Sequence, residues 1–193
     1  MQDFWLWFTI GLQHILDFNG YDHICYVTAL TVLFPLNEWK KLLILVTAFT
    51  IGHSLTLALS VLNFISLPQK MIECLIPITI IITCIYNIIS SKNPPKRVSF
   101  NYVLALIFGF IHGMGFSYLL KSLLGRQESI IAPLFSFNIG LEAGQLVIVA
   151  SILFISVILQ TFTGVQRKHY VLFVSSAVFV ISTLLLVQRI NET

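Results

Sequence analysis

The chain has 193 residues, of which 57% are hydrophobic and 10% are charged, and its formal net charge is +3. A soluble domain carries roughly a quarter charged residues, and one of this size still exposes about a third of its unfolded surface. A mean hydropathy of +0.92 therefore excludes an ordinary water-soluble protein and predicts an integral membrane protein. The basic residues form no run with interleaved aromatic residues, so we expect no nucleic acid as a partner.

Long and unbroken apolar segments divide the chain, and they favour helices over a transmembrane barrel, whose strands alternate in polarity. A helical span needs about 20 apolar residues, or somewhat fewer where neighbouring protein shields its ends. Six segments fit this requirement: 21–36, 42–65, 71–90, 101–124, 132–160 and 170–188. The loops between them are too short to be domains. The sequence therefore predicts one transmembrane domain, residues 1–193, which is an all-α polytopic bundle of six spans plus a short N-terminal helix.

That short helix is the segment 3–18, DFWLWFTIGLQHILDF, which is too short to cross a membrane comfortably. Trp5 and Trp7 are typical of the membrane–water interface. We expect an interfacial or partly re-entrant helix that packs against the bundle, with a seventh span as the alternative. The chain opens with MQDFWLW, which has no basic region or cleavage site, so we expect no signal peptide.

Two histidines and an acid stand around the start of the first span. Asp22 and His23 are adjacent, and Gly20 permits a tight turn just before them. If the short helix folds back, the imidazole of His14 approaches the Asp22–His23 pair. Two imidazoles and a carboxylate are ligands for a divalent transition metal such as nickel, cobalt, zinc, copper or iron. Asp17 lies between them, either as a further ligand or as an interfacial charge.

Two later spans each carry a histidine in the middle. His53, in the second span, follows Gly52, which lets another helix come close, and precedes Ser54. His112, in the fourth span, lies among three glycines, where backbones can pack tightly and a cation could pass. A lone histidine in a span can simply bond to a neighbouring helix, and glycine-rich stretches are often packing surfaces. Each motif alone therefore leaves both interpretations open.

A further polar group lies in the fifth span. Asn138, Glu142 and Gln145 stand at i, i+4 and i+7, on one face of a helix. Glu142 alone could be a protonated structural acid. Ionisable groups at membrane depth are costly and usually face the bundle interior or a wet cavity. Four of the five histidines and two acids fall in glycine-marked segments of a chain that is otherwise almost free of charge. We therefore predict one shared polar site inside the membrane.

The distribution of basic residues predicts the orientation. The loops 37–41, 91–97 and 166–169 hold seven lysine and arginine residues. The opposite side holds four, which are Lys70, Lys121, Arg126 and Arg189. By the positive-inside rule the first three loops are cytoplasmic. With six spans, both termini then lie outside.

Four runs of residues, taken together, resemble the HupE/UreJ family of membrane proteins. They are the histidine–aspartate group at 14–23, FTIGHSLTL at 49–57, FGFIHGMGF at 108–116 and FNIGLEAGQ at 137–145. The runs occur in order across about residues 4–160, and the chain length also fits the family. Better-known members have a signal peptide and a His-Pro element ahead of the Asp-His pair. Here Ile15 follows His14, so the chain resembles a divergent branch of the family.

The resemblance implies a permease for nickel or cobalt in the inner membrane of a bacterium, with copper, iron and zinc left open. No prosthetic group is expected, and the divalent metal ion is the substrate. The metal positions that the resemblance implies are His14, Asp22, His23, His53, His112 and Glu142. The supporting polar positions are Asp17, Asn138, Gln145 and Ser54. The expected partners are the lipid bilayer and the metal ion, and another membrane or outer-membrane uptake protein is a further candidate.

Two other functions fit the same residues. An intramembrane zinc hydrolase acting on a lipid would use three histidines and a carboxylate as ligands and a second acid as general base. The sequence lacks HExxH, and His53 and Ser54 are no nucleophile–base pair because adjacent helical residues point about 100° apart. A non-transporting accessory protein would use its polar groups only to fix helix packing. We expect a transporter rather than an enzyme, driven by a gradient or a partner because no nucleotide-binding motif is present.

Overall fold

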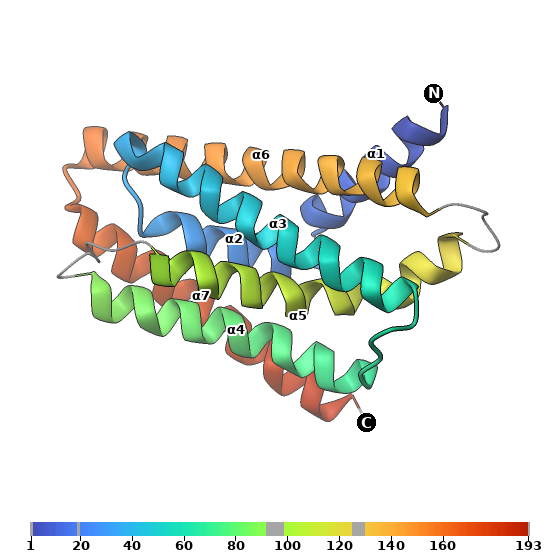
Figure 1. Ribbon diagram of the computed structural model, residues 1–193. Coiled ribbons are helices and arrows are strands. Elements are labelled where there is room, and N and C mark those ends of the chain that lie inside the picture. Colours follow the sequence, from blue (N-terminus) through green and yellow to red (C-terminus); the bar gives the residue numbers. More distant parts are fainter. Residues whose placement is uncertain (1, 19, 92–98, 125–129, 193) are drawn as a thin grey trace.

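The computed structural model describes residues 2–18, 20–91, 99–124 and 130–192, and these residues form a helical bundle (Figure 1). The helices are α1 (Gln2–Leu16), α2 (Asp22–Val32), α3 (Trp39–Val61), α4 (Gln69–Ser90), α5 (Ser99–Leu124), α6 (Ile131–Thr163) and α7 (Arg167–Asn191). A 3-10 turn, Leu36–Glu38, precedes α3. The described ranges contain no strand. The predicted all-α fold is confirmed.

Within the described ranges, five helices are long and apolar enough to cross a bilayer, and they are α3, α4, α5, α6 and α7. They agree with five of the six predicted spans. The prediction of a continuous span over 21–36 is wrong, because α2 has only 11 residues and the backbone is extended at Pro35. A helix of that length covers about 17 Å at 1.5 Å per residue. This is roughly half of a hydrocarbon core about 30 Å thick.

The first crossing of the bundle is instead divided between α1 and α2. α1 begins at the end of the bundle where α7 ends and stops near the middle, and α2 continues toward the opposite end (Figure 1). The two helices have 15 and 11 residues. Their combined length is similar to that of a single long helix of the bundle, such as α3 with 23 residues. Helix α1, which lies within segment 3–18, packs along α6 as expected, and with α2 it makes a broken crossing of the bundle.

Two helix pairs approach closely because glycine stands at their contact. At Gly109 of α5, an added Cβ would collide with the backbone carbonyl of Phe49 in α3. Gly52 of α3 meets α5 in the same way, and Gly11 and Gly140 do so between α1 and α6. Contacts of backbone on backbone are typical of membrane helices with small residues at the interface. Three of these glycines lie within one turn of a candidate histidine, so the close packing sets the positions of those histidines.

Filling the contact between α3 and α5 should destabilise the bundle. We expect Gly109→Val to lower the free energy of unfolding by about 1–3 kcal/mol, because overpacking forces the two backbones apart. Thermal unfolding of the purified protein in detergent measures this effect. Ala150→Val adds the same side chain on the exposed face of α6 and should leave the stability nearly unchanged. Equal stability of the two variants would contradict the close contact.

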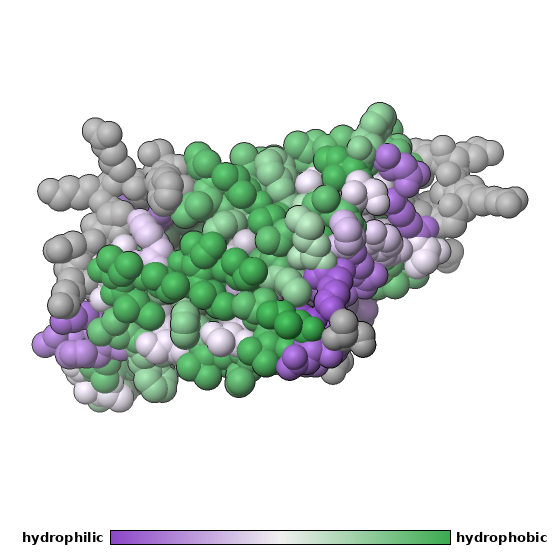
Figure 2. Space-filling model, turned by 90° about the horizontal axis from the view of Figure 1, so that it is seen from below, coloured by the Kyte–Doolittle hydropathy of each residue, from purple (hydrophilic) through white to green (hydrophobic). Residues whose placement is uncertain are grey.

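The bundle has a hydrophobic middle and polar ends. Figure 2 shows hydrophobic residues over the middle of one face and hydrophilic residues gathered toward its two ends. The starts of α3, α5 and α7 lie at one end of the bundle, and the starts of α4 and α6 lie at the other. At the first end, the first turns of α3 and α7 carry Lys40, Lys41, Arg167 and Lys168. The other cations used to predict the orientation of those loops, Lys92, Lys96 and Arg97, and Arg126 on the opposite side, lie outside the described residues.

Candidate metal centre

Four histidines from four helices meet inside the bundle, next to the break between α1 and α2. His14 lies in the last turn of α1, and His23 lies in the first turn of α2. His53 and His112 lie near the middle of α3 and α5. Nitrogens of the first three lie within 4.8 Å of one another, and the ring of His112 lies 5.3 Å from that of His23, centre to centre. The fold thus brings together four residues that the sequence analysis selected in separate segments.

The spacing of the first three histidines suits one ion held by three imidazoles. A metal–nitrogen bond is about 2.1 Å long, so two ligands of one ion stand at most about 4.2 Å apart. Nitrogens that already lie within 4.8 Å of one another need only a small rotation of their rings to share an ion.

Hydrogen bonds determine which nitrogen of His23 and of His112 can bind a metal. Nδ1 of His23 lies 2.9 Å from Oδ1 of Asp22. Nδ1 of His112 lies 2.9 Å from the carbonyl oxygen of Phe108. An ionised carboxylate and a carbonyl only accept, so Nδ1 carries the hydrogen in both rings and Nε2 keeps a free lone pair. A carboxylate bonded in this way also orients the ligand and raises its basicity.

The cluster concentrates buried nitrogens that have no hydrogen-bond partner among the described residues. His53 and His112 are fully buried, and His23 is 5% exposed. Nε2 of all four rings and Nδ1 of His53 find no partner within the described part of the chain. Leaving a buried polar group unsatisfied costs about 1–3 kcal/mol. So many in one place leave five nitrogens of the cluster available to a ligand.

Aromatic rings enclose the histidines. Phe116 of α5 lies 4.0 Å from the ring of His14, centre to centre, and Phe137 of α6 stacks on Phe116 at 5.0 Å. Phe49 of α3 lies 5.2 Å from the ring of His112. These rings give the histidines apolar neighbours, and electrostatic interactions are stronger in such surroundings. Sequence reasoning did not select Phe116 or Phe137, although each stands at the edge of a glycine-marked run.

Glu142 lies apart from the three-histidine group, between α3 and α6. Thr47 donates a hydrogen bond to its Oε1 at 2.7 Å, and Thr50 donates one to Oε1 of Gln145 at 2.8 Å. Thr47, Thr50 and His53 follow one another at intervals of three along α3. The two hydrogen-bonded pairs therefore extend the polar site from the histidines toward the start of α3. The spacing is visible in the sequence, whereas the partners across the two helices are visible only in the fold.

The remaining predicted polar residues occupy three different environments. Ser54 donates a hydrogen bond to the carbonyl oxygen of Thr50 at 2.6 Å, within its own helix. Asn138 is half-buried, and its Oδ1 has no partner in the described ranges. Asp17 is exposed and lies beside His14 on the lining of a cavity.

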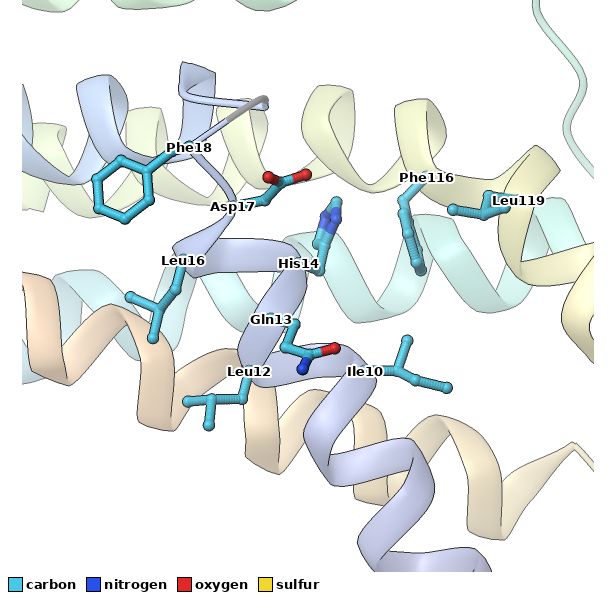
Figure 3. Close-up of a pocket in the computed structure, with 9 residues that line it drawn as sticks. All are labelled: Ile10, Leu12, Gln13, His14, Leu16, Asp17, Phe18, Phe116 and Leu119. Carbon is cyan, nitrogen blue, oxygen red and sulfur yellow. The ribbon is translucent and has the colours of Figure 1, made fainter.

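Two cavities reach the histidines. The larger, of about 650 Å³, lies between α1 and α5, and Figure 3 shows the imidazole of His14 between Asp17 and Phe116 on its wall. Most of its lining is apolar, from Ile10, Leu12, Leu16, Phe18, Phe116 and Leu119. The smaller cavity, of about 170 Å³, is lined by His14, His23 and His112 together with charged side chains of α4 and α7.

Comparison with known proteins gives one finding. A family model described as HupE / UreJ protein matches residues 1–189, which is nearly the whole chain. Neither the curated proteins nor the solved structures that were compared with the chain give a match.

Proposed function

The chain belongs to the HupE/UreJ family, and on that premise we propose that it is a permease for a divalent transition-metal ion. The observation that carries the proposal is the group of three imidazoles whose nitrogens lie within 4.8 Å of one another. This group lies inside an integral membrane bundle in which five helices are long and apolar enough to cross a bilayer.

The ligands suit an ion that binds and then leaves. Imidazole nitrogens bind nickel, cobalt, copper, zinc and iron, and the family favours nickel or cobalt. The three rings are neutral ligands, and Asp22 acts on the ion through its hydrogen bond to His23. An ion bound by three neutral imidazoles can enter the site and can also leave it, and conduction requires both. The metal is accordingly the substrate of the protein.

The broken crossing also supports transport. In many transporters, discontinuous helices place their ends and unwound backbone at a binding site near the middle of the membrane. Here α1 ends and α2 begins beside the histidines, so His14 and His23 bind the ion from opposite sides of the break.

We infer that the ion passes from the end of the bundle where α1 begins to the end where α3 begins. The second end carries Lys40, Lys41, Arg167 and Lys168, which by the positive-inside rule makes it cytoplasmic. Beyond the histidines, Glu142 and the hydroxyl of Thr47 offer oxygen ligands on this side. In the inner membrane of a bacterium this direction is uptake, driven by a gradient or by a partner protein.

Equilibrium metal binding tests this proposal. We expect the purified protein in detergent to bind one nickel or cobalt ion per chain and to release it to a chelator. His53→Ala should abolish this binding because it removes one of the three converging imidazoles. His169→Ala, a matched change at an exposed histidine of α7, should leave binding intact.

Elemental analysis of the same samples separates the alternatives. Stoichiometric zinc that survives the chelator would favour the lipid hydrolase, because three histidines with an open position also suit catalytic zinc. If the protein binds no metal, and if His53→Ala and His169→Ala change only its stability, the results would favour a non-transporting accessory protein.

A further inference from the structure

The smaller cavity combines the histidines with four charged side chains. The carboxylates of Asp17, Asp22 and Glu73 line it, together with the guanidinium of Arg189. Oxygens of Asp17 and Asp22 lie 3.8 and 4.0 Å from the place that a Cβ on Gly20 would occupy, so both carboxylates face the same space. With neutral histidines, three carboxylates and one guanidinium leave two net negative charges on the lining. That charge matches one divalent cation.

The cavity ends at nitrogens that lack a partner in the described part of the chain. His23 and His112 are at least nine-tenths buried, both line the cavity, and Nε2 of each is unpartnered there. The larger cavity reaches only His14 among the four histidines and is mostly apolar. A hydrated ion loses favourable solvation along an apolar wall and keeps polar contacts along a charged one. The smaller cavity is therefore the better route for an ion.

An ion pair joins α4 and α7 on the lining of this cavity. Nη1 of Arg189 lies 3.9 Å from Oε2 of Glu73, and the two side chains are 35% and 32% exposed. The pair is long, and each member has a second partner. Nη1 of Arg189 lies 3.1 Å from Oε2 of Glu192, and Gln69 donates a hydrogen bond to Oε1 of Glu73 at 2.7 Å. Arg189 can therefore leave Glu73 and remain paired.

We propose that the smaller cavity is the entrance for the metal ion and that the Glu73–Arg189 ion pair controls access to it. The inference rests on the proposed function. Glu73 attracts the arriving ion. The guanidinium of Arg189 occupies the place beside Glu73 until the ion displaces this guanidinium toward Glu192. A divalent ion displaces a guanidinium more readily than a monovalent ion does, because its attraction to the carboxylate is twice as strong at the same distance. The pair thus favours divalent ions at the entrance.

The rate at which cobalt reaches the histidines tests this proposal. Rapid mixing of Co²⁺ with the full-length protein in detergent, followed by the visible absorption of coordinated cobalt, gives the association rate constant. We expect Arg189→Gln to raise it and Glu73→Gln to lower it, each by roughly tenfold, since charges around a cleft change association rates on this scale. Arg189→Lys, which keeps the charge, should resemble the wild type. The double variant should lie between the two single variants.

The matched control is Lys121→Gln, which removes a cation from the same end of the bundle. Lys121 donates a hydrogen bond to Asn63 and does not line the cavity, so its removal should change the rate little. Wild-type association rates in Arg189→Gln and Glu73→Gln would overturn the proposed entrance while leaving the metal centre in place. No cobalt signal in the wild type would overturn the proposed function and this inference together. Glu73→Gln provides an independent measurement if Arg189→Gln fails to fold.

Discussion

Metal accumulation is expected to fall at least about 100-fold when His23 is replaced by alanine. Loss of a residue that only hydrogen-bonds to a metal ligand already lowers metal affinity or activity by about 10–100-fold. His23 occupies the centre of the cluster, with its ring 4.5 Å from that of His14 and 5.3 Å from that of His112. Its removal deletes one of three converging ligands and the one that Asp22 orients. Accumulation of radioactive nickel or cobalt by cells that express the protein measures the effect.

His169→Ala is the matched control for this variant, since it deletes an exposed imidazole from the start of α7. Membrane content of each variant must be compared with that of the wild type, because a misfolded protein also fails to transport. Undiminished accumulation of every metal tested in His23→Ala would refute the permease.

The second large effect is expected at Glu142. Glu142→Gln keeps an oxygen that can accept the hydrogen bond from Thr47 but removes the negative charge. We expect uptake to fall about 10-fold or more, because in the proposed path the charge of Glu142 would stabilise the ion beyond the histidines. Equilibrium binding of cobalt should change little, since Glu142 lies outside the group formed by His14, His23 and His53. Uptake into proteoliposomes and binding in detergent, measured on the same preparation, separate the two effects.

Glu38→Gln serves as the control for this change. Glu38 pairs with Lys41 at 2.6 Å in the turn before α3, so its substitution removes an acid from the same end of the bundle without touching the polar path. If Glu142→Gln and Glu38→Gln transport equally well, Glu142 is a structural acid that only joins α6 to α3.

The sequence predicted the spans well where hydropathy alone decides them. Each of the five long helices is a continuous apolar segment between polar loops, and such a segment has no other stable arrangement in a bilayer. The same criterion failed at 21–36. Pro35 disfavours helix at the residue before it, but hydropathy does not register this, and α2 ends at Val32.

The candidate site was predictable to the extent that its residues are rare in a membrane. His14, His23, His53 and His112 stand out because imidazoles seldom occur at that depth. Glu73 could not be selected in this way, because nothing local distinguishes an acid that reaches for the headgroups from one that lines a cavity. Its position opposite Arg189 depends on how α4 packs against α7, which local sequence patterns do not encode.

The division of the first crossing of the bundle into α1 and α2 should also affect how the chain enters the membrane during synthesis. Neither α1, with 15 residues, nor α2, with 11, is long enough to be inserted as a span by itself. An acid at the centre of an inserted helix costs roughly 2.5–3.5 kcal/mol, and Asp22 lies at the break. The helix against which both segments pack, α6, begins only at Ile131. We therefore expect the first helices to settle in the bilayer after most of the chain has been made. The histidine cluster, whose first two members leave the ribosome earliest, would then be among the last parts of the protein to form.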